Sequence, residues 1–261
     1  MVSELIAKDD LIMKLRISVK NLKEIADLLN TIVSEAKLTF KKDGVIIKAV
    51  DPAHVAMVSL EIPSGSFEVY DLDAEEDISL DIERLKSILK LASSGDVISI
   101  TKEKDRLKFE MGTIVKTLSL LDNNTITTPR VPQVSSESYV VVAKYELEKG
   151  LKAAEDVSDS IRLTLTANDF RARSLSDTEE SEMILSKELL KEIRCEESVK
   201  SSYPLDYLLK LVKSLSSTDS LKLSFKDDYP LTIEFEFGQP AKGSSDGYIK
   251  GIFLLAPRME Q

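Results

Sequence analysis

Side chains able to perform catalytic or metal chemistry are scarce in this sequence. The chain has one histidine, His54, and one cysteine, Cys195. A single imidazole and a single thiol, with no second titrating partner or ligand at a suitable spacing, do not form a nucleophile–base pair or a metal site. We therefore expect no catalytic residue and no metal, and we interpret His54 as lining a binding pocket. The lone cysteine is typical of a reducing, intracellular setting.

Two further patterns bear on bound ions and nucleotides. The acid-rich stretch 71–77 reads DLDAEED. It lacks the glycine and the closing glutamate of a calcium loop, so we interpret it as solvated surface. The phosphate-binding patterns G-x-x-x-x-G-K-[ST] and G-x-G-x-x-G do not occur in the sequence. We expect no cofactor, and without a catalytic constellation an enzyme is disfavoured.

The charge balance restricts the partner classes. The 261 residues include 35 basic and 45 acidic side chains, for a net charge of −10. Phosphate contacts need concentrated Lys and Arg, so a nucleic-acid partner requires that positive charge be segregated on one surface. No apolar run approaches the ~18 residues of a membrane span, and the N-terminus lacks the pattern of a signal peptide. We expect an intracellular protein of the cytoplasm or nucleoid.

The sequence contains an internal repeat. Residues 38–50 (LTFKKDGVIIKAV) correspond to 163–175 (LTLTANDFRARSL), an offset of 125 residues (163 − 38). Residues 88–96 (ILKLASSGD) correspond to 211–219 (LVKSLSSTD), an offset of 123 (211 − 88). Offsets that barely drift along the chain indicate a duplicated domain. Each half has two helix-period segments among many period-2 segments, which predicts two α+β domains with helices packed on antiparallel sheet.

A proline- and Ser/Thr-rich stretch separates the two halves and reads as an extended connector. We expect an N-terminal extension over 1–12, a first domain over 13–121, the connector over 122–138 and a second domain over 139–261.

Positive charge is concentrated on the four predicted helices. Residues 20–33, 82–92, 144–157 and 205–215 together hold ten basic and eight acidic side chains, a sum of +2, which leaves −12 for the rest of the chain. This bias could be an ordinary solvated helix face or a surface for a polyanion.

Two stretches resemble the signature sequences of the proliferating cell nuclear antigen family of DNA sliding clamps, in its archaeal type. Residues 43–60 (DGVIIKAVDPAHVAMVSL) resemble the first signature, and Tyr229-Pro230-Leu231 with 253–258 (FLLAPR) resemble the second. The resemblance covers about 13–258. It implies a trimeric ring that encircles duplex DNA, with helices lining the pore and antiparallel sheets outside. Such a ring serves as a processivity factor for DNA polymerase in replication and repair.

The resemblance also implies which residues face the DNA. Lysines that contact phosphates without reading bases suit a ring that must slide. Asp206 lies where many family members keep a basic residue, which predicts a lighter contact from the last helix. By position, the pore residues are Lys20, Lys23, Arg84, Lys86, Lys90, Lys149, Lys152, Lys210 and Lys213.

The family binds short peptide motifs in a hydrophobic pocket beneath the connector, so the implied partners are DNA polymerase, flap endonuclease, DNA ligase and the clamp loader. Such a pocket should be apolar with a few polar anchors. Leu254 replaces an aromatic residue of some members, which predicts a different peptide preference. The matching positions are Val50, His54, Val55, Met57, Val131, Pro132, Tyr229, Pro230, Leu254, Ala256 and Pro257.

Ring closure needs strand edges that pair between subunits. The matching strands are 113–121 and 182–187, which we expect to pair head to tail. Some archaeal rings contain three different chains, so a homotrimer and a heterotrimer both stay open. Family members begin near Met13, which makes 1–12 either an extra tail or the product of an upstream start codon. The alternative functions are a clamp-like subunit of a checkpoint or damage-signalling ring and a β-rich scaffold that binds only proteins.

Overall fold

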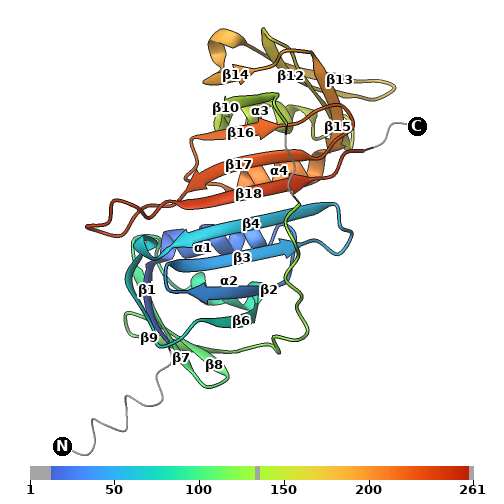
Figure 1. Ribbon diagram of the computed structural model, residues 1–261. Helices are drawn as coiled ribbons and strands as arrows, with labels where there is room; N and C mark the ends of the chain where they lie inside the picture. The colour runs from blue at the N-terminus through green and yellow to red at the C-terminus, as the bar shows by residue number, and fades with distance from the viewer. Residues whose placement is uncertain (1–12, 133–135, 259–261) are drawn as a thin grey trace, which may run out of the picture. The chain divides into compact units, whose positions relative to one another are not determined.

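The structure is a computed structural model that describes residues 13–132 and 136–258 (Figure 1). The predicted extension 1–12 and the connector residues 133–135 lie outside the described residues. The described part contains four α-helices and eighteen strands. None of these helices has the length and apolar character needed to span a bilayer.

The first repeat runs from β1 to β9. Its elements are β1 (Met13–Ser18), α1 (Val19–Leu29), β2 (Glu35–Lys41), β3 (Gly44–Val50), β4 (Ala56–Pro63), β5 (Phe67–Leu72), β6 (Glu76–Asp81), α2 (Ile82–Leu89), β7 (Val97–Glu103), β8 (Arg106–Met111) and β9 (Ile114–Ser119), with a 3-10 turn, Ser64–Ser66, before β5.

The second repeat runs from β10 to β18. Its elements are β10 (Tyr139–Ala143), α3 (Lys144–Ala154), β11 (Ser160–Leu165), β12 (Asp169–Leu175), β13 (Glu180–Ser186), β14 (Glu192–Arg194), β15 (Val199–Pro204), α4 (Leu205–Ser214), β16 (Ser220–Ser224), β17 (Leu231–Phe237) and β18 (Ile249–Leu255), with a 3-10 turn, Lys187–Leu189, before β14.

The two repeats have the same topology. The strand order β5-β1-β7-β8-β9 in the first repeat matches β14-β10-β16-β17-β18 in the second, and β4-β3-β2-β6 matches β13-β12-β11-β15. The register also agrees, because Phe40 pairs with Val45 in the first hairpin and Leu165 pairs with Phe170 in the second. The predicted duplicated α+β fold is therefore confirmed.

Contacts along the chain divide the molecule into two compact units. The first takes in Met1–Ala49, Ser59–Arg130 and Glu236–Lys250, and the second takes in Val50–Val58, Val131–Phe235 and Gly251–Gln261. Each unit thus includes a short segment from the other half of the chain. The domain boundaries expected from the sequence stay a prediction. The segment Val50–Val58 brings four of the predicted pocket residues into the second unit.

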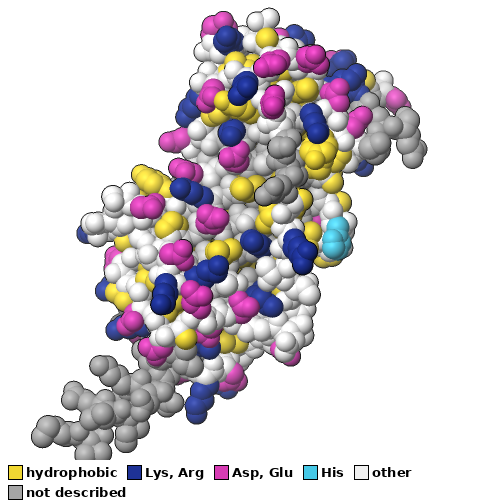
Figure 2. All heavy atoms as spheres, viewed as in Figure 1, with side chains coloured by type: hydrophobic (Ala, Val, Ile, Leu, Met, Phe, Trp, Pro, Cys, Tyr) yellow, Lys and Arg dark blue, Asp and Glu magenta, His cyan; other side chains and the backbone are white. Residues whose placement is uncertain are grey.

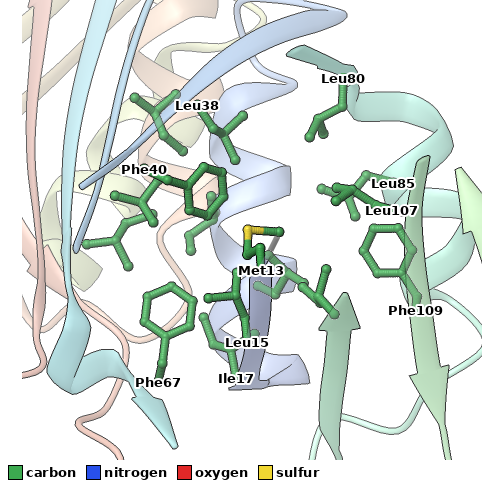
Figure 3. A pocket seen from close by; sticks show the side chains of 16 residues that line it. Met13, Leu15, Ile17, Leu38, Phe40, Phe67, Leu80, Leu85, Leu107 and Phe109 are labelled. Atoms are coloured by element: carbon green, nitrogen blue, oxygen red, sulfur yellow. The ribbon is translucent and has the colours of Figure 1, made fainter. Parts of the chain in front are cut away.

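Each unit buries apolar side chains between paired helices and sheet. Helix α1 packs on α2 in the first unit, and α3 packs on α4 in the second. Strand β1 alternates buried and exposed residues, as expected when one face of a sheet is covered. The first unit also contains a cavity of about 50 Å³ lined only by apolar side chains, including Met13, Phe40, Val45 and Phe109 (Figure 3).

Candidate DNA-facing helices and partner-binding loop

The helices of the first unit are fixed at their N-termini by side chains. Ser18 Oγ accepts a hydrogen bond from Asn21 N (3.1 Å) ahead of α1, and Asp81 Oδ1 accepts one from Arg84 N (2.8 Å) ahead of α2. Such N-caps satisfy amide groups that have no partner within the helix. With their apolar faces buried, both helices present most of their charged side chains outward, whereas Glu24 of α1 is 3% exposed.

The five predicted pore residues of this unit differ in whether their charged groups already have a hydrogen-bond or ion-pair partner. Lys23 Nζ donates to the carbonyl of Ala92 (2.7 Å), Lys86 pairs with Asp27 (3.0 Å) and Arg84 pairs with Asp81 (3.4 Å). Lys20 and Lys90 are exposed and have no ion-pair or hydrogen-bond partner for their ammonium groups within the described chain. Those two ammonium groups are the most available for phosphate.

In the second unit, the helix charges are mostly paired. Glu148 accepts from both Lys144 (2.8 Å) and Lys152 (2.7 Å), and these two hydrogen bonds lower the pKa of the Glu148 carboxyl against the opposing effect of burial. Lys210 pairs with Asp206 (3.2 Å), and Lys213 lies 3.4 Å from Glu155. The lighter DNA contact expected from the last helix stays a prediction.

Lys149 is the remaining predicted pore residue of α3. It is exposed and has no ion-pair or hydrogen-bond partner for its ammonium group among residues 13–132 and 136–258. Neither α3 nor α4 has a side-chain N-cap, since Ala143 and Pro204 occupy those positions. The nine predicted pore residues thus lie on two helix pairs, and three of them are unpaired within the described chain. Their contact with DNA stays a prediction.

The sheet-side surface carries charges of both signs. Figure 2 shows Lys and Arg side chains interspersed with Asp and Glu over the strands of each unit. A mixed surface of this kind does not concentrate positive potential for phosphate binding.

The predicted partner pocket belongs to the second unit, because all eleven residues fall within its segments. The N–H of Ala256 donates to the carbonyl of Val55 (2.8 Å), which joins the loop before β4 to the chain after β18. His54 is exposed, whereas Met57 and Leu254 are 8% and 7% exposed. Val50, Val131, Pro230 and Pro257 are half-buried and Pro132 is exposed.

Tyr229 is held from two sides. Its carbonyl accepts a hydrogen bond from the Tyr203 hydroxyl (2.7 Å), and Lys226 Nζ lies 3.9 Å from the centre of its ring. The first contact holds the backbone at this position, and the second places a cation over the half-buried ring. The contacts of Val131 and Pro132 with a peptide stay a prediction.

Two residues of this site were not found from the sequence. Asp51 is buried at 3% exposure, and its carboxylate accepts hydrogen bonds from three amides of the following loop and from the Tyr207 hydroxyl. An Asp that precedes a Pro-containing turn is a known signal for side-chain-to-backbone bonding, so Asp51 was open to recognition. Tyr207 gave no signal, because its contact joins residues 156 positions apart.

Both strands expected to close the ring lie at sheet edges. Strand β9 ends one sheet and exposes Ile114 and Val115, while β13 ends another and exposes Ile184. Lys116 on β9 and Glu182 on β13 are opposite in charge. Pairing between subunits stays a prediction. Within the described residues, no cluster of His, Cys, Asp or Glu is placed to hold a metal ion.

Comparison with known proteins decides the family. A family model described as "Proliferating cell nuclear antigen, N-terminal domain" matches residues 13–119. The DNA polymerase sliding clamp of Thermoplasma acidophilum is 57% identical over 248 residues, which cover 95% of this chain and 99% of the relative. This chain belongs to the DNA polymerase sliding clamp family. The sliding clamp of Picrophilus torridus is 58% identical over 247 residues, with coverage of 95% and 99%.

Solved sliding clamps agree with this membership. A. fulgidus PCNA, solved with the C-terminal region of FEN-1 bound to it, matches with a TM-score of 0.88 at 29% identity, covering 95% of this chain and 99% of that one. PCNA of Thermococcus kodakaraensis matches with a TM-score of 0.84 at 26% identity, covering 94% and 100%. The predicted clamp family and fold are confirmed, and the relatives' names favour the replication clamp over a checkpoint subunit.

Proposed function

We propose that this sliding clamp subunit encircles duplex DNA as part of a closed three-subunit ring, with its four helices facing the DNA. The observation that carries the proposal is the repeated helix pair, which on each repeat presents lysines without a partner among the described residues, while the sheet side carries mixed charge. A positive inner layer attracts phosphates, and a negative remainder limits contact with DNA elsewhere on the surface.

Lys20, Lys90 and Lys149 make the main phosphate contacts in this proposal. Lys23, Arg84, Lys86, Lys152, Lys210 and Lys213 contribute less, because each already has a carboxylate or carbonyl partner. Long, mobile ammonium groups exchange between neighbouring phosphates and read no base, so the ring holds DNA without fixing its position along the duplex.

Partner proteins dock through short peptide motifs at the surface formed by the loop before β4, Tyr229 and the chain after β18. The complex of A. fulgidus PCNA with the C-terminal region of FEN-1 supports this proposal for a flap endonuclease. DNA polymerase, DNA ligase and the clamp loader are the other partners we propose. The protein acts as a tether, with no catalysis and no cofactor of its own. We propose that it acts on DNA inside the cell.

Adjacent subunits join by antiparallel pairing of β9 with β13. Each is an edge strand with apolar side chains exposed. The unpaired N–H and C=O groups of such an edge can form hydrogen bonds with a strand of another subunit. Lys116 and Glu182 add opposite charge to the two edges. The partners in the ring are either two more copies of this chain or two sister clamp chains.

Primer extension on singly primed circular DNA tests the function and the subunit requirement together. With clamp loader and polymerase present, this chain, alone or with candidate sister subunits, should lengthen the products of a single binding event. A linear template with open ends is the control, since a ring slides off it. Size-exclusion chromatography with light scattering that shows only monomer, even with sister subunits supplied, would contradict the ring.

A further inference from the structure

One carboxylate organises the loop between β3 and β4. Oδ1 of Asp51 accepts hydrogen bonds from the amides of Val55 (2.7 Å) and Ala56 (2.6 Å). Oδ2 accepts from the amide of Ala53 (3.1 Å) and from the hydroxyl of Tyr207 (2.8 Å). Each oxygen thus has two donors, and the buried charge is fully satisfied. The course of the loop depends on where this carboxylate is held.

The loop contains an unfavourable backbone conformation at His54 that needs contacts from its surroundings. His54 has φ of 57°, in the left-handed region that side chains other than glycine rarely adopt. Such residues persist where the surroundings over-determine them. Backbone bonds from His54 N to Asp51 O (3.0 Å) and from Asp51 N to Ala56 O (3.0 Å) close the loop around the carboxylate. The result is an exposed His54 beside a half-buried Val55.

Tyr207 brings the fourth donor from a rigid element. It lies in the first turn of α4, whose position is set by the buried side chains of Leu205, Leu208 and Leu209. Burial would raise the pKa of Asp51, but the four hydrogen bonds outweigh it and hold that pKa below its ordinary value. The hydrogen bond to Asp51 in turn raises the pKa of Tyr207 to about 12. At neutral pH the contact is therefore charge-assisted, from a neutral hydroxyl to a carboxylate.

The hydrogen bond between Tyr207 and Asp51 has no counterpart at the matched positions of the other repeat. At the matched positions, Ser176 stands in place of Asp51 and Arg84 in place of Tyr207. Ser176 instead accepts hydrogen bonds from Thr178 N and Glu179 N of its own turn, and Arg84 pairs with Asp81. The carboxylate–hydroxyl contact thus belongs to the loop before β4, which carries predicted partner-binding residues, and is absent from the matched turn after β12.

We propose that Tyr207 is a positioning residue of the partner-peptide site. Its hydroxyl holds Asp51 so that the loop presents His54 and Val55 in the binding conformation, and Tyr207 itself touches no peptide atom. The inference rests on the partner surface proposed above. Without the hydroxyl, the loop samples other conformations, and the apparent affinity falls in proportion to the fraction that stays competent.

The test measures association and dissociation rates of a labelled peptide on the assembled ring. The probe is a synthetic peptide with the sequence of the C-terminal region of A. fulgidus FEN-1. Tyr207→Phe should lower the association rate constant roughly 3- to 10-fold and leave the dissociation rate within about twofold, since fewer rings are competent at any moment. His54→Ala, which removes a side chain of the surface itself, should instead raise the dissociation rate.

The matched control is Tyr139→Phe, which removes a tyrosine hydroxyl bonded to Glu192 on β14. It should leave both rates unchanged. Hydrogen exchange gives a second readout: the amides of Val55 and Ala56 should exchange faster in Tyr207→Phe, while those of β11 keep their protection. If Tyr207→Phe fails to assemble, Asp51→Asn keeps the side-chain size and should show the same fall in association rate.

The outcomes separate the two proposals. A wild-type ring that does not bind the peptide overturns the proposed partner site and the inference with it. A wild-type ring that binds, together with a Tyr207→Phe ring that binds at the same rate, overturns the inference alone. A Tyr207→Phe effect confined to the dissociation rate also overturns it, because Tyr207 would then be a contact residue.

Discussion

Where the first repeat places Val45 and Leu80, the second places Phe170 and Tyr203. The pairing register fixes both matches, since Ala36 pairs with Leu80 in the first repeat and Ile161 pairs with Tyr203 in the second. Val45 and Leu80 line the 50 Å³ cavity, whereas Phe170 and Tyr203 are both fully buried. A cavity of this size costs about 1 kcal/mol at ~24 cal/mol per Å³. One topology therefore tolerates cores of different packing.

The helix layers differ as well. In the first repeat both helices have side-chain N-caps, and Lys20 and Lys90 are unpaired within the described chain. In the second repeat neither helix has such a cap, and most basic groups are matched by acids. The duplicated fold thus fixes where helices and sheets lie, while the capping of the helices and the pairing of their basic groups differ between the repeats.

The largest expected effect comes from giving the second repeat the smaller side chain of the first. Phe170→Val should lower the free energy of unfolding by about 2–3 kcal/mol, because a fully buried ring is replaced by a cavity. Val45→Ile, which enlarges the matched side chain of the first repeat, should gain up to about 1 kcal/mol by filling space. Thermal and denaturant unfolding of the two variants would measure this. Equal losses from both would show that the two cores are packed alike.

The next largest effect is a difference between the two helix pairs in how strongly their lysines contribute to DNA binding. Replacing Lys20 and Lys90 with Ala should weaken binding of the ring to duplex roughly tenfold at low salt and reduce the salt slope by about 0.9 for each phosphate that the ring no longer neutralises. Replacing Lys210 and Lys213, which already have carboxylate partners, should do markedly less. Fluorescence anisotropy on a short duplex at several salt concentrations reads both. Equal effects would contradict the expected difference between lysines unpaired within the described chain and lysines paired with carboxylates.

Removing the N-cap of α1, or adding one to α3, should change the free energy of unfolding by about 1 kcal/mol in opposite directions. Ser18→Ala removes the acceptor for Asn21 N and should destabilise the protein by that amount, whereas Ala143→Ser at the matched position of α3 should stabilise it by up to as much. Both backbones at these positions are extended, as a cap requires. Chemical denaturation with a double variant close to wild type would confirm that the two changes are independent and opposite.

The smallest effect is a pH dependence. The folded protein holds the pKa of Glu148 below its ordinary value, first through the hydrogen bond from Lys144 and then through that from Lys152. This contribution is fully present above the unfolded pKa and is lost as the pH falls through the lower folded value. Glu148→Gln should therefore cost a few tenths of a kcal/mol at neutral pH and nothing below the folded pKa. Unfolding at a series of pH values would show the two curves converge in acid.

Much of this fold follows from the sequence because its signals are periodic. Constant offsets between the halves indicate the duplication, and helical periodicity indicates the four helices. The predicted helices extend past the observed ones at their C-terminal ends: the helix predicted over 20–33 ends at Leu29, and the one predicted over 82–92 ends at Leu89. Ile32 and Ala92 continue the apolar pattern because they are buried beyond the helices, so periodicity reports burial and not the end of the helix.

The site was less accessible to prediction. Motif resemblance predicted the pocket residues and the basic pore residues, and both sets stay predictions. Which lysines are neutralised depends on the particular carboxylates brought near them, as for Lys213 and Glu155, which lie 58 positions apart in sequence. The Asp51–Tyr207 contact joins positions farther apart still. Pairs of this kind are determined by tertiary packing, which composition and spacing do not encode locally.

The central claim, that this chain acts as part of a ring around DNA, is tested most directly by topology. Labelled clamp is loaded on a nicked circular plasmid, unbound protein is removed, and the bound fraction is followed before and after one restriction cut. The account predicts slow loss from the circle and rapid loss once the DNA has ends. Equal rates of loss from circular and linear DNA would contradict it, because a clamp held only by surface contacts does not sense the ends.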